Sequence, residues 1–354
     1  MWLIMKTFSL KETNISKGVA CILLLVHHLF GNPRDYGLFY NGLYIGNKLL
    51  ISGVSASAKV CVAIFVILSG YGLSKSAEKS GKANAYFAYK HLVKLFFQYW
   101  FIFIIFVPLG FIFGRDPIDI YGSGIRGIFN FLIDFTGLAN IFCTPTMNGT
   151  WWYMGVVIIL YIMFPIFFKM IKKSPYVSLA AAFAICIFGT AAGRWYHALL
   201  AWIFPFVAGI YLAQSGLLDK TVNLKHKGYV AAVSLVSAIL IAVVRYAVSG
   251  FVLRIDTFFA LAIIILTVSF LSDIKCVGSL LEFIGIHSAN IFMMHTFIYL
   301  YYFQRAIYAV YYPVFIVCVL LAITLLISVG LEKLKALLRY DELSKALLRA
   351  GGSK

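Results

Sequence analysis

Residues 17–29 read KGVACILLLVHHL, and this stretch decides the class of fold. Its apolar run is typical of a membrane-spanning helix, and it places His27 and His28 deep inside that predicted helix. An ionisable group at such a depth costs free energy and usually serves a function. Because Lys17 and His28 are eleven positions apart, they lie within about 20° of one helix face and about 16 Å apart along its axis. The stretch predicts a cation near the mouth of the helix and a titratable base in its interior.

The composition extends this prediction to the whole chain. Hydrophobic residues make up 62% of the sequence and charged residues only 12%, and the mean hydropathy is +0.93. A water-soluble globule cannot hide that much apolar surface. We predict an all-α integral membrane protein of about ten transmembrane helices, with residues 1–332 as one polytopic domain and residues 333–354 as a basic cytoplasmic tail. The predicted spans are centred near residues 24, 62, 103, 161, 185, 205, 238, 262, 295 and 319.

Charge placement favours both termini on the cytoplasmic side, since Lys and Arg collect in cytoplasmic loops. With ten spans, 21 of the 30 basic residues fall inside, and nineteen of these are lysines. The outer loops and span interiors hold mostly arginines. The net charge of +17 therefore indicates orientation and contact with anionic membrane lipids rather than nucleic-acid binding. We expect a multi-pass protein of the cytoplasmic membrane.

Two further features constrain the chemistry. The six cysteines are scattered without a CxxC pair, so neither a metal site nor a disulfide framework is predicted. Residues 125–138, in the large outer loop, are amphipathic at helical spacing. They fit equally a loop helix that packs over the bundle and a lid over a substrate.

Six segments then follow one another in a particular order. They are Lys17 with His28 after ten intervening residues, VCVAIFVILSGYGLSKS (60–76), YFAYKHLVKLFFQYW (86–100), TWWYMGVVIILYIMFP (150–165), FPFVAGIYLA (204–213) and GIHSANIFMMH (285–295). In this order they resemble the motifs of the acyltransferase 3 family of membrane O-acyltransferases, whose first helix carries an R-x10-H signature. Each motif alone is short, but six in sequence around an intramembrane histidine are specific.

The resemblance implies transfer of an acyl group, usually acetyl from cytoplasmic acetyl-CoA, to a hydroxyl of a cell-surface carbohydrate or its lipid-linked precursor. Three positions depart from the family pattern. Lys17 replaces the usual Arg, so a bidentate grip becomes a point charge. Ala63 and Val157 stand where the family often has carboxylates. A histidine–carboxylate dyad built from those motifs is excluded, and the orientation of His28 must come from elsewhere.

The residues suit this chemistry. A neutral imidazole in a site of low dielectric takes the proton of an attacking alcohol, and we predict His28 as that general base with Lys17 as its partner in the catalytic motif. Cations near the inner face would bind the phosphates of an acyl-CoA co-substrate; no permanently bound cofactor or metal is predicted. The predicted donor-binding residues are Lys90, Lys94, Ser69 and Tyr71.

A second set of residues is predicted to contact the acceptor or form a second site: His295, Arg194, Arg245, Trp152 and Tyr161. Each prediction has a plainer alternative. The histidines fit polar contacts between helices, the lysines fit topology signals, arginines at helix ends snorkel, and aromatic residues at a boundary fit an interfacial belt.

Two rival functions remain open. A transporter or flippase also places histidines and arginines inside a bundle, and a non-catalytic membrane module would bind an amino acid or glycan without needing His28. The enzyme needs acyl-CoA and modifies its acceptor covalently, whereas the transporter does neither. The sequence does not identify the acceptor, the length of the acyl chain or the oligomeric state.

Overall fold

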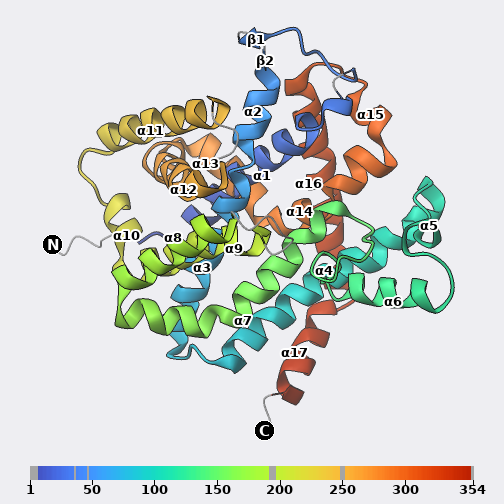
Figure 1. Ribbon diagram of the computed structural model, residues 1–354, viewed down its shortest axis with the longest axis horizontal. Helices are drawn as coiled ribbons and strands as arrows, with labels where there is room; N and C mark the ends of the chain where they lie inside the picture. Colours follow the sequence, from blue (N-terminus) through green and yellow to red (C-terminus); the bar gives the residue numbers. More distant parts are fainter. Residues whose placement is uncertain (1–6, 36, 46–47, 191–196, 248–251, 352–354) are drawn as a thin grey trace. The chain divides into compact units, whose positions relative to one another are not determined.

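The computed structural model describes residues 7–35, 37–45, 48–190, 197–247 and 252–351 (Figure 1). These residues are mostly helical, which confirms an all-α membrane protein. Seven helical segments are long and apolar enough to cross a membrane. They are Leu10–Phe30, Leu50–Ser80, Ala85–Phe113, Gly149–Lys173, Lys227–Ala247, Ile255–Asp273 and Pro313–Leu337. Lys275–Ile286 and Ser288–Tyr302 pass the same test together and would make an eighth.

Fewer helices than the predicted ten or so are long and apolar enough to cross a membrane in the described residues. All ten predicted centres lie in helices, but two of those helices, α8 (Pro175–Thr190) and α9 (His197–Ser215), have only short apolar stretches in the described residues. The 16 residues of α8 extend about 24 Å, whereas the hydrocarbon core is about 30 Å thick. Hydropathy detects both segments, but it does not show whether each crosses.

The chain forms two compact units. The first unit comprises Met1–Gly37, Asn41–Lys82 and Ile166–Ser288, and the second comprises Leu38–Tyr40, Ala83–Pro165 and Ala289–Lys354. Besides α8 and α9, the first unit holds α1 (Leu10–Phe30), β1 (Tyr44–Ile45), β2 (Lys48–Leu49), α2 (Leu50–Ala58), α3 (Cys61–Ser80), α10 (Leu217–Val222), α11 (Lys227–Ala247), α12 (Val252–Ser269) and α13 (Lys275–Ile286). The two strands pair antiparallel, with Tyr44 opposite Leu49.

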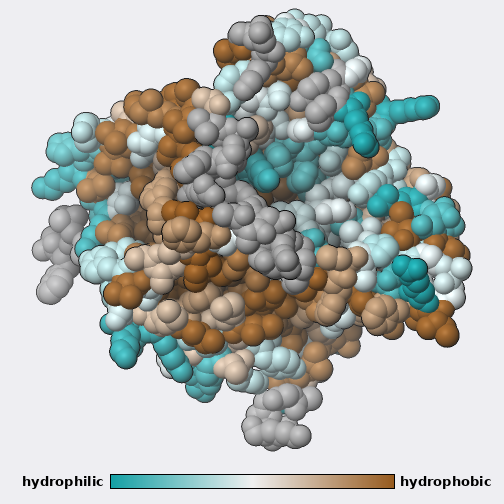
Figure 2. Space-filling view, in the orientation of Figure 1, coloured by the Kyte–Doolittle hydropathy of each residue, from teal (hydrophilic) through white to brown (hydrophobic). Residues whose placement is uncertain are grey.

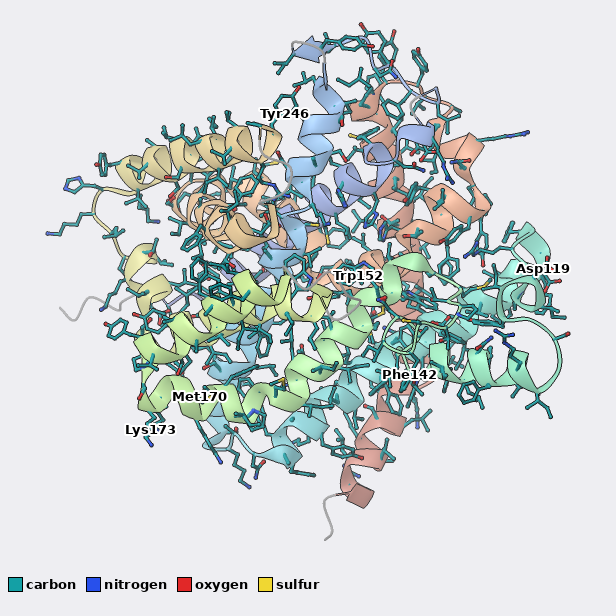
Figure 3. The ribbon with its side chains drawn as sticks, in the orientation of Figure 1. Asp119, Phe142, Trp152, Met170, Lys173 and Tyr246 are labelled. Atoms are coloured by element: carbon teal, nitrogen blue, oxygen red, sulfur yellow. The ribbon has the colours of Figure 1, made fainter. Side chains whose placement is uncertain are left out.

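The second unit is built around the long helix α4. Its other elements are α5 (Pro117–Tyr121), α6 (Gly124–Phe135), α14 (Ser288–Thr296), α15 (Gln304–Tyr308), α16 (Pro313–Leu337) and α17 (Tyr340–Gly351), and α4 itself runs over Ala85–Phe113. A π-helical turn, Phe297–Tyr302, follows α14. Helix α7 (Trp152–Lys173) begins in this unit and ends in the first; Figure 3 labels its two terminal residues. The helix predicted at 125–138 is present as α6.

Glycines let the helices of the first unit approach closely. A Cβ atom at Gly18 of α1 would overlap the backbone of Leu281 on α13, and one at Gly285 of α13 would overlap the backbone of Asn14 on α1. Small residues permit this contact in membranes, where packing rather than hydrophobicity joins helices. The same reciprocal arrangement joins α3 to α9, through Gly70 against Phe206 and Gly209 against Ile67. These crossings fix α1 and α3 within the unit.

Other helices present apolar side chains outward. Along α11, Val236 is 55% exposed and Leu240 60%, and Figure 2 shows hydrophobic residues over this helix. Such a face is compatible with lipid and not with water.

The predicted tail continues as helix. Helix α16 extends past residue 333 to Leu337, and α17 follows. The Tyr340 hydroxyl donates to the carbonyl of Phe97 (3.1 Å), and Tyr86 of α4 donates to the carbonyl of Leu348 (3.3 Å). Both ends of α17 therefore contact α4.

Candidate functional site

The two histidines of α1 lie in its last turn. The helix begins at Leu10, seven residues before Lys17, because Ser9 and Glu12 form a capping box at its N-terminus. Its last helical residue is Phe30. The prediction of a base deep in the span is corrected, since His27 and His28 lie near the end of the helix opposite to its capped start. Both side chains are half-buried, and their ring centroids are 5.0 Å apart.

His27 is held by the neighbouring helix α2. Its Nδ1 lies 3.0 Å from the carbonyl oxygen of Ser55, and the Ser55 hydroxyl donates to the carbonyl of His27 at 3.0 Å. A carbonyl oxygen only accepts, so this bond assigns the proton of a neutral His27 ring to Nδ1 and leaves the Nε2 lone pair available. Through these two contacts α2 fixes the orientation of the His27 ring at the end of α1.

A buried ion pair lies beside this contact. Arg245 of α11 and Asp256 of α12 are 2.5 Å apart, with side chains 1% and 0% exposed. The second terminal nitrogen of Arg245 donates to the carbonyl of Ala56 on α2 at 2.9 Å. Arg245 was predicted to contact substrate from the outer side, but the structure places it in a buried intramolecular pair. Asp256 was not predicted; its sequence signal is a lone carboxylate at the start of a long apolar run.

Lys17 lies half-buried on α1. Within the described part of the chain no hydrogen bond or ion pair engages its ammonium group. In a membrane such a cation calls for an anionic partner. Its place on the same face of α1 as His28 follows from their spacing along a continuous helix.

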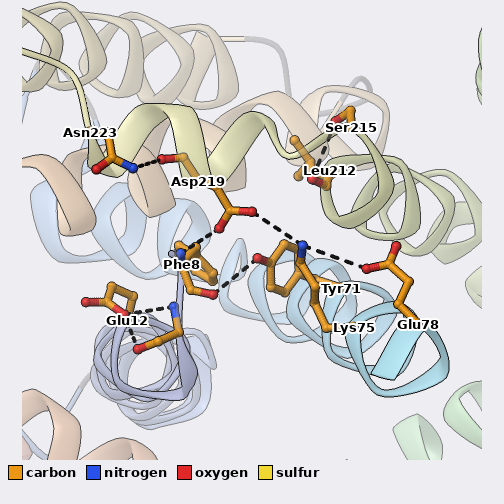
Figure 4. Close-up of polar contacts among 10 residues, drawn as sticks. Phe8, Glu12, Tyr71, Lys75, Glu78, Leu212, Ser215, Asp219 and Asn223 are labelled. Carbon is orange, nitrogen blue, oxygen red and sulfur yellow. Dashed lines mark hydrogen bonds and ion pairs between the residues drawn. The ribbon is translucent and has the colours of Figure 1, made fainter. Parts of the chain in front are cut away.

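A polar cluster of the first unit joins Phe8, near the start of the chain, to α3 and α10 (Figure 4). Asp219 of α10 accepts from the Phe8 amide (2.6 Å) and from Lys75 of α3 (3.3 Å). The Tyr71 hydroxyl donates to the Phe8 carbonyl at 3.2 Å. Tyr71, a predicted donor-binding residue, therefore uses its hydroxyl hydrogen in a bond within the protein. Ser69, on the same helix, is half-buried.

A cavity opens at the ends of α3, α7 and α9 and the start of α8. Its volume is about 490 Å³, and its lining includes Glu78, Phe168, Lys172, Tyr176 and Gln214. Gln214 is held by the carbonyl of Phe168 at 3.2 Å. The lysine-rich loops beside it are those predicted to face the cytoplasm. This cavity offers both charge signs and aromatic surface to a ligand.

The remaining predicted residues lie in the second unit or outside the described residues. Lys90 and Lys94 are exposed on α4, and the Lys90 ammonium lies 5.7 Å from the centre of the Tyr86 ring. Trp152 and Tyr161 are half-buried on α7. Arg194 lies outside the described residues. The first unit thus holds Lys17, His28, Ser69, Tyr71 and Arg245, and the second holds Lys90, Lys94, Trp152, Tyr161 and His295.

His295 lies at the centre of a hydrogen-bonded network. It is fully buried, its Nδ1 is 2.9 Å from the carbonyl of Phe292, and its Nε2 is 3.3 Å from the Thr296 hydroxyl. The neighbouring anchor is Trp151, whose indole donates to the carbonyl of Met293 at 3.0 Å. The predicted residue, Trp152, is half-buried next to it, and a sequence motif does not reveal which of two adjacent rings is buried.

A family model described as an acyltransferase domain, of the acyltransferase 3 type, matches residues 11–333, nearly the whole chain. No curated protein and no solved structure matches the chain.

Proposed function

This chain belongs to the acyltransferase 3 family, and from that premise we propose that this membrane acyltransferase is an O-acyltransferase of the cytoplasmic membrane. It moves an acetyl or other short acyl group from cytoplasmic acyl-CoA to a hydroxyl of a cell-surface or lipid-linked carbohydrate. The observation that carries the proposal is that Lys17 and His28 share one face of α1. Lys17 is half-buried, and its ammonium group has no hydrogen bond or ion pair with any residue that the structure describes.

In the proposed reaction His28 removes the proton of the acceptor hydroxyl as its oxygen attacks the thioester carbonyl. The carbon–sulfur bond breaks, the acyl group forms an ester with the acceptor, and the CoA thiolate takes up the proton from the imidazolium. A histidine at the outer end of α1, by the predicted topology, suits an acceptor that lies on the outer side.

The donor must approach from the opposite side. The cationic Lys17 would meet a phosphate of the donor, and the acyl arm would then extend about 16 Å along α1 to reach His28. Lys172, at the cavity near the predicted inner face, supplies a further cation for an anionic cofactor tail. Tyr71 and Ser69 lie on α3 of the same unit and line this route in the proposal.

The test is an acyl-transfer assay on purified protein in lipid, which follows CoA released from acetyl-CoA in the presence of a pool of candidate glycans. We expect acceptor-dependent release from the wild type and a loss of about 100-fold or more in His28→Ala, since a general base contributes that much. His226→Ala is the matched control, because His226 is exposed in a loop, and it should behave as the wild type. Full release from His28→Ala would exclude His28 as the base, and a failure of acetyl-CoA to bind would favour a transporter.

A further inference from the structure

The buried pair Arg245–Asp256 is costly to keep in a membrane protein. Moving two charges out of water carries a desolvation penalty that their attraction repays only with good geometry and further hydrogen bonds. In this pair the Nε of Arg245 and the Oδ2 of Asp256 are buried without a hydrogen-bond partner in the described structure. Replacement of a buried ion pair by well-packed apolar side chains of similar volume is often neutral or stabilising. The pair therefore calls for an explanation other than stability.

The contact with α2 supplies one. The last four carbonyls of a helix have no partner within that helix, and α2 ends at Ala58. The amide of Lys59, which would ordinarily reach Ser55, donates to Ser57 instead. Ala56 accepts from Arg245, and Ser55 accepts from His27. Two adjacent carbonyls at the C-terminal end of α2 are thus satisfied by the ion pair and by the histidine.

The same arrangement closes the end of α1. The carbonyl of His27 belongs to the last turn of α1 and accepts from the Ser55 hydroxyl. A chain of contacts therefore runs from Asp256 on α12 through Arg245 on α11 and the end of α2 to His27 and the adjacent ring of His28. A guanidinium at a helix C-terminus is also favoured by the helix dipole.

We propose that Arg245 and Asp256 are positioning residues for the histidine pair: they hold the end of α2 so that its Ser55 carbonyl keeps the proton of His27 on Nδ1. This inference rests on the proposed function. Asp256 would take the orienting role of the carboxylates that the family often has where this chain has Ala63 and Val157. The carboxylate acts at a distance, through Arg245 and a backbone carbonyl, rather than on the imidazole of His28. The other ionisable groups that act electrostatically on this region are Lys59 and Cys61.

The test replaces the pair by apolar residues, as Arg245→Met with Asp256→Leu. The matched control is Lys227→Gln with Asp273→Asn, since Lys227 and Asp273 join α11 to the turn after α12 by a more exposed ion pair at 2.9 Å. The first readout is the tautomer of His27 from ¹⁵N-histidine NMR spectra, with the signal assigned by its loss in His27→Asn. The second is the pH profile, kcat and KM of acetyl transfer.

We expect the wild type and the control to show His27 protonated on Nδ1. The double variant should lose that single tautomer, with kcat lower by about 10- to 100-fold, a changed pH profile and little change in KM for acetyl-CoA. Arg245→Lys keeps the charge opposite Asp256 but loses the forked contact with Ala56, so it should fold and show the same shift in tautomer. A wild-type His27 tautomer in both variants would overturn the inference. Absence of acyl transfer in the wild type would remove the proposed function, while the NMR comparison would still decide the positioning role.

Discussion

Asp134 shows how its surroundings decide the behaviour of a single residue. This carboxyl on α6 is 1% exposed, and its Oδ2 accepts from the Tyr121 hydroxyl (2.7 Å) and from the Met147 amide (2.8 Å). Burial raises the pKa of Asp134 to about 6, although the hydrogen bonds from Met147 and Tyr121 oppose that shift. Burial and the neighbouring Asp134 also raise the pKa of Tyr121, so its hydroxyl stays a donor.

The stability of the protein should therefore fall as the pH rises from about 4 to about 6. Below that window Asp134 is protonated in both the folded and the unfolded state. Within the window the folded state binds more protons than the unfolded chain, so a rise in pH lowers the free energy of unfolding. Asp134→Asn, which keeps an acceptor oxygen, should remove this part of the pH dependence. The measurement is the midpoint of thermal unfolding in lipid between pH 4 and pH 7.

Asp119→Asn is the control, because Asp119 is exposed on the adjacent helix α5 (Figure 3). It should keep the pH dependence of the wild type. An unchanged slope in Asp134→Asn would show that another group titrates in this window.

At the scale of elements, the crossing of α1 with α13 holds the N-terminal half of the helix that carries His27 and His28 in its last turn. Gly285 is buried in α13 and lies against the backbone of Asn14, so the contact cannot relax by the movement of a flexible side chain. Sequence identified Gly285 only as the start of a family motif. Only a residue without a Cβ atom fits at this position, because the two helices pack so closely there.

Gly285→Ala should therefore lower the free energy of unfolding by about 1–3 kcal/mol, the usual cost of overfilling a packed contact. Gly330→Ala is the control, since Gly330 is also helical, in α16, and a Cβ there meets nothing within 4 Å. Thermal or denaturant unfolding of both variants in lipid measures the difference. Equal stability of the two variants would mean that α1 and α13 separate without cost.

At the scale of the whole molecule, the number of crossings depends on α8 and α9. By the predicted topology both the loop before α8 and the loop after α9 face the cytoplasm, whether the two helices cross as a pair or turn back within the membrane. The charge pattern is the same in the two cases, so it agrees with ten spans as well as with fewer. In the described residues, seven helices, or eight with the bent pair, are long and apolar enough to cross a membrane.

Labelling of single cysteines decides between the two cases. In a background without the six native cysteines, Arg126→Cys should react with an impermeant maleimide from outside, and Lys82→Cys only after permeabilisation. Gly193→Cys, between α8 and α9, should react from outside if both helices cross. A cysteine at 193 that reacts only from inside would reduce the number of spans to eight.

The sequence by itself determined the membrane class, the place of each apolar helix and the family, because hydropathy and motif order are read from neighbouring residues along the chain. The amphipathic helix α6 and the placement of Lys17 and His28 on one helix have the same local origin. Only the tertiary structure joined Arg245 to Ala56, 189 residues apart, and His27 to Ser55, 28 residues apart. Which carbonyl at a helix end lacks a partner, and which side chain fills it, depends on how helices cross, and no local pattern encodes that.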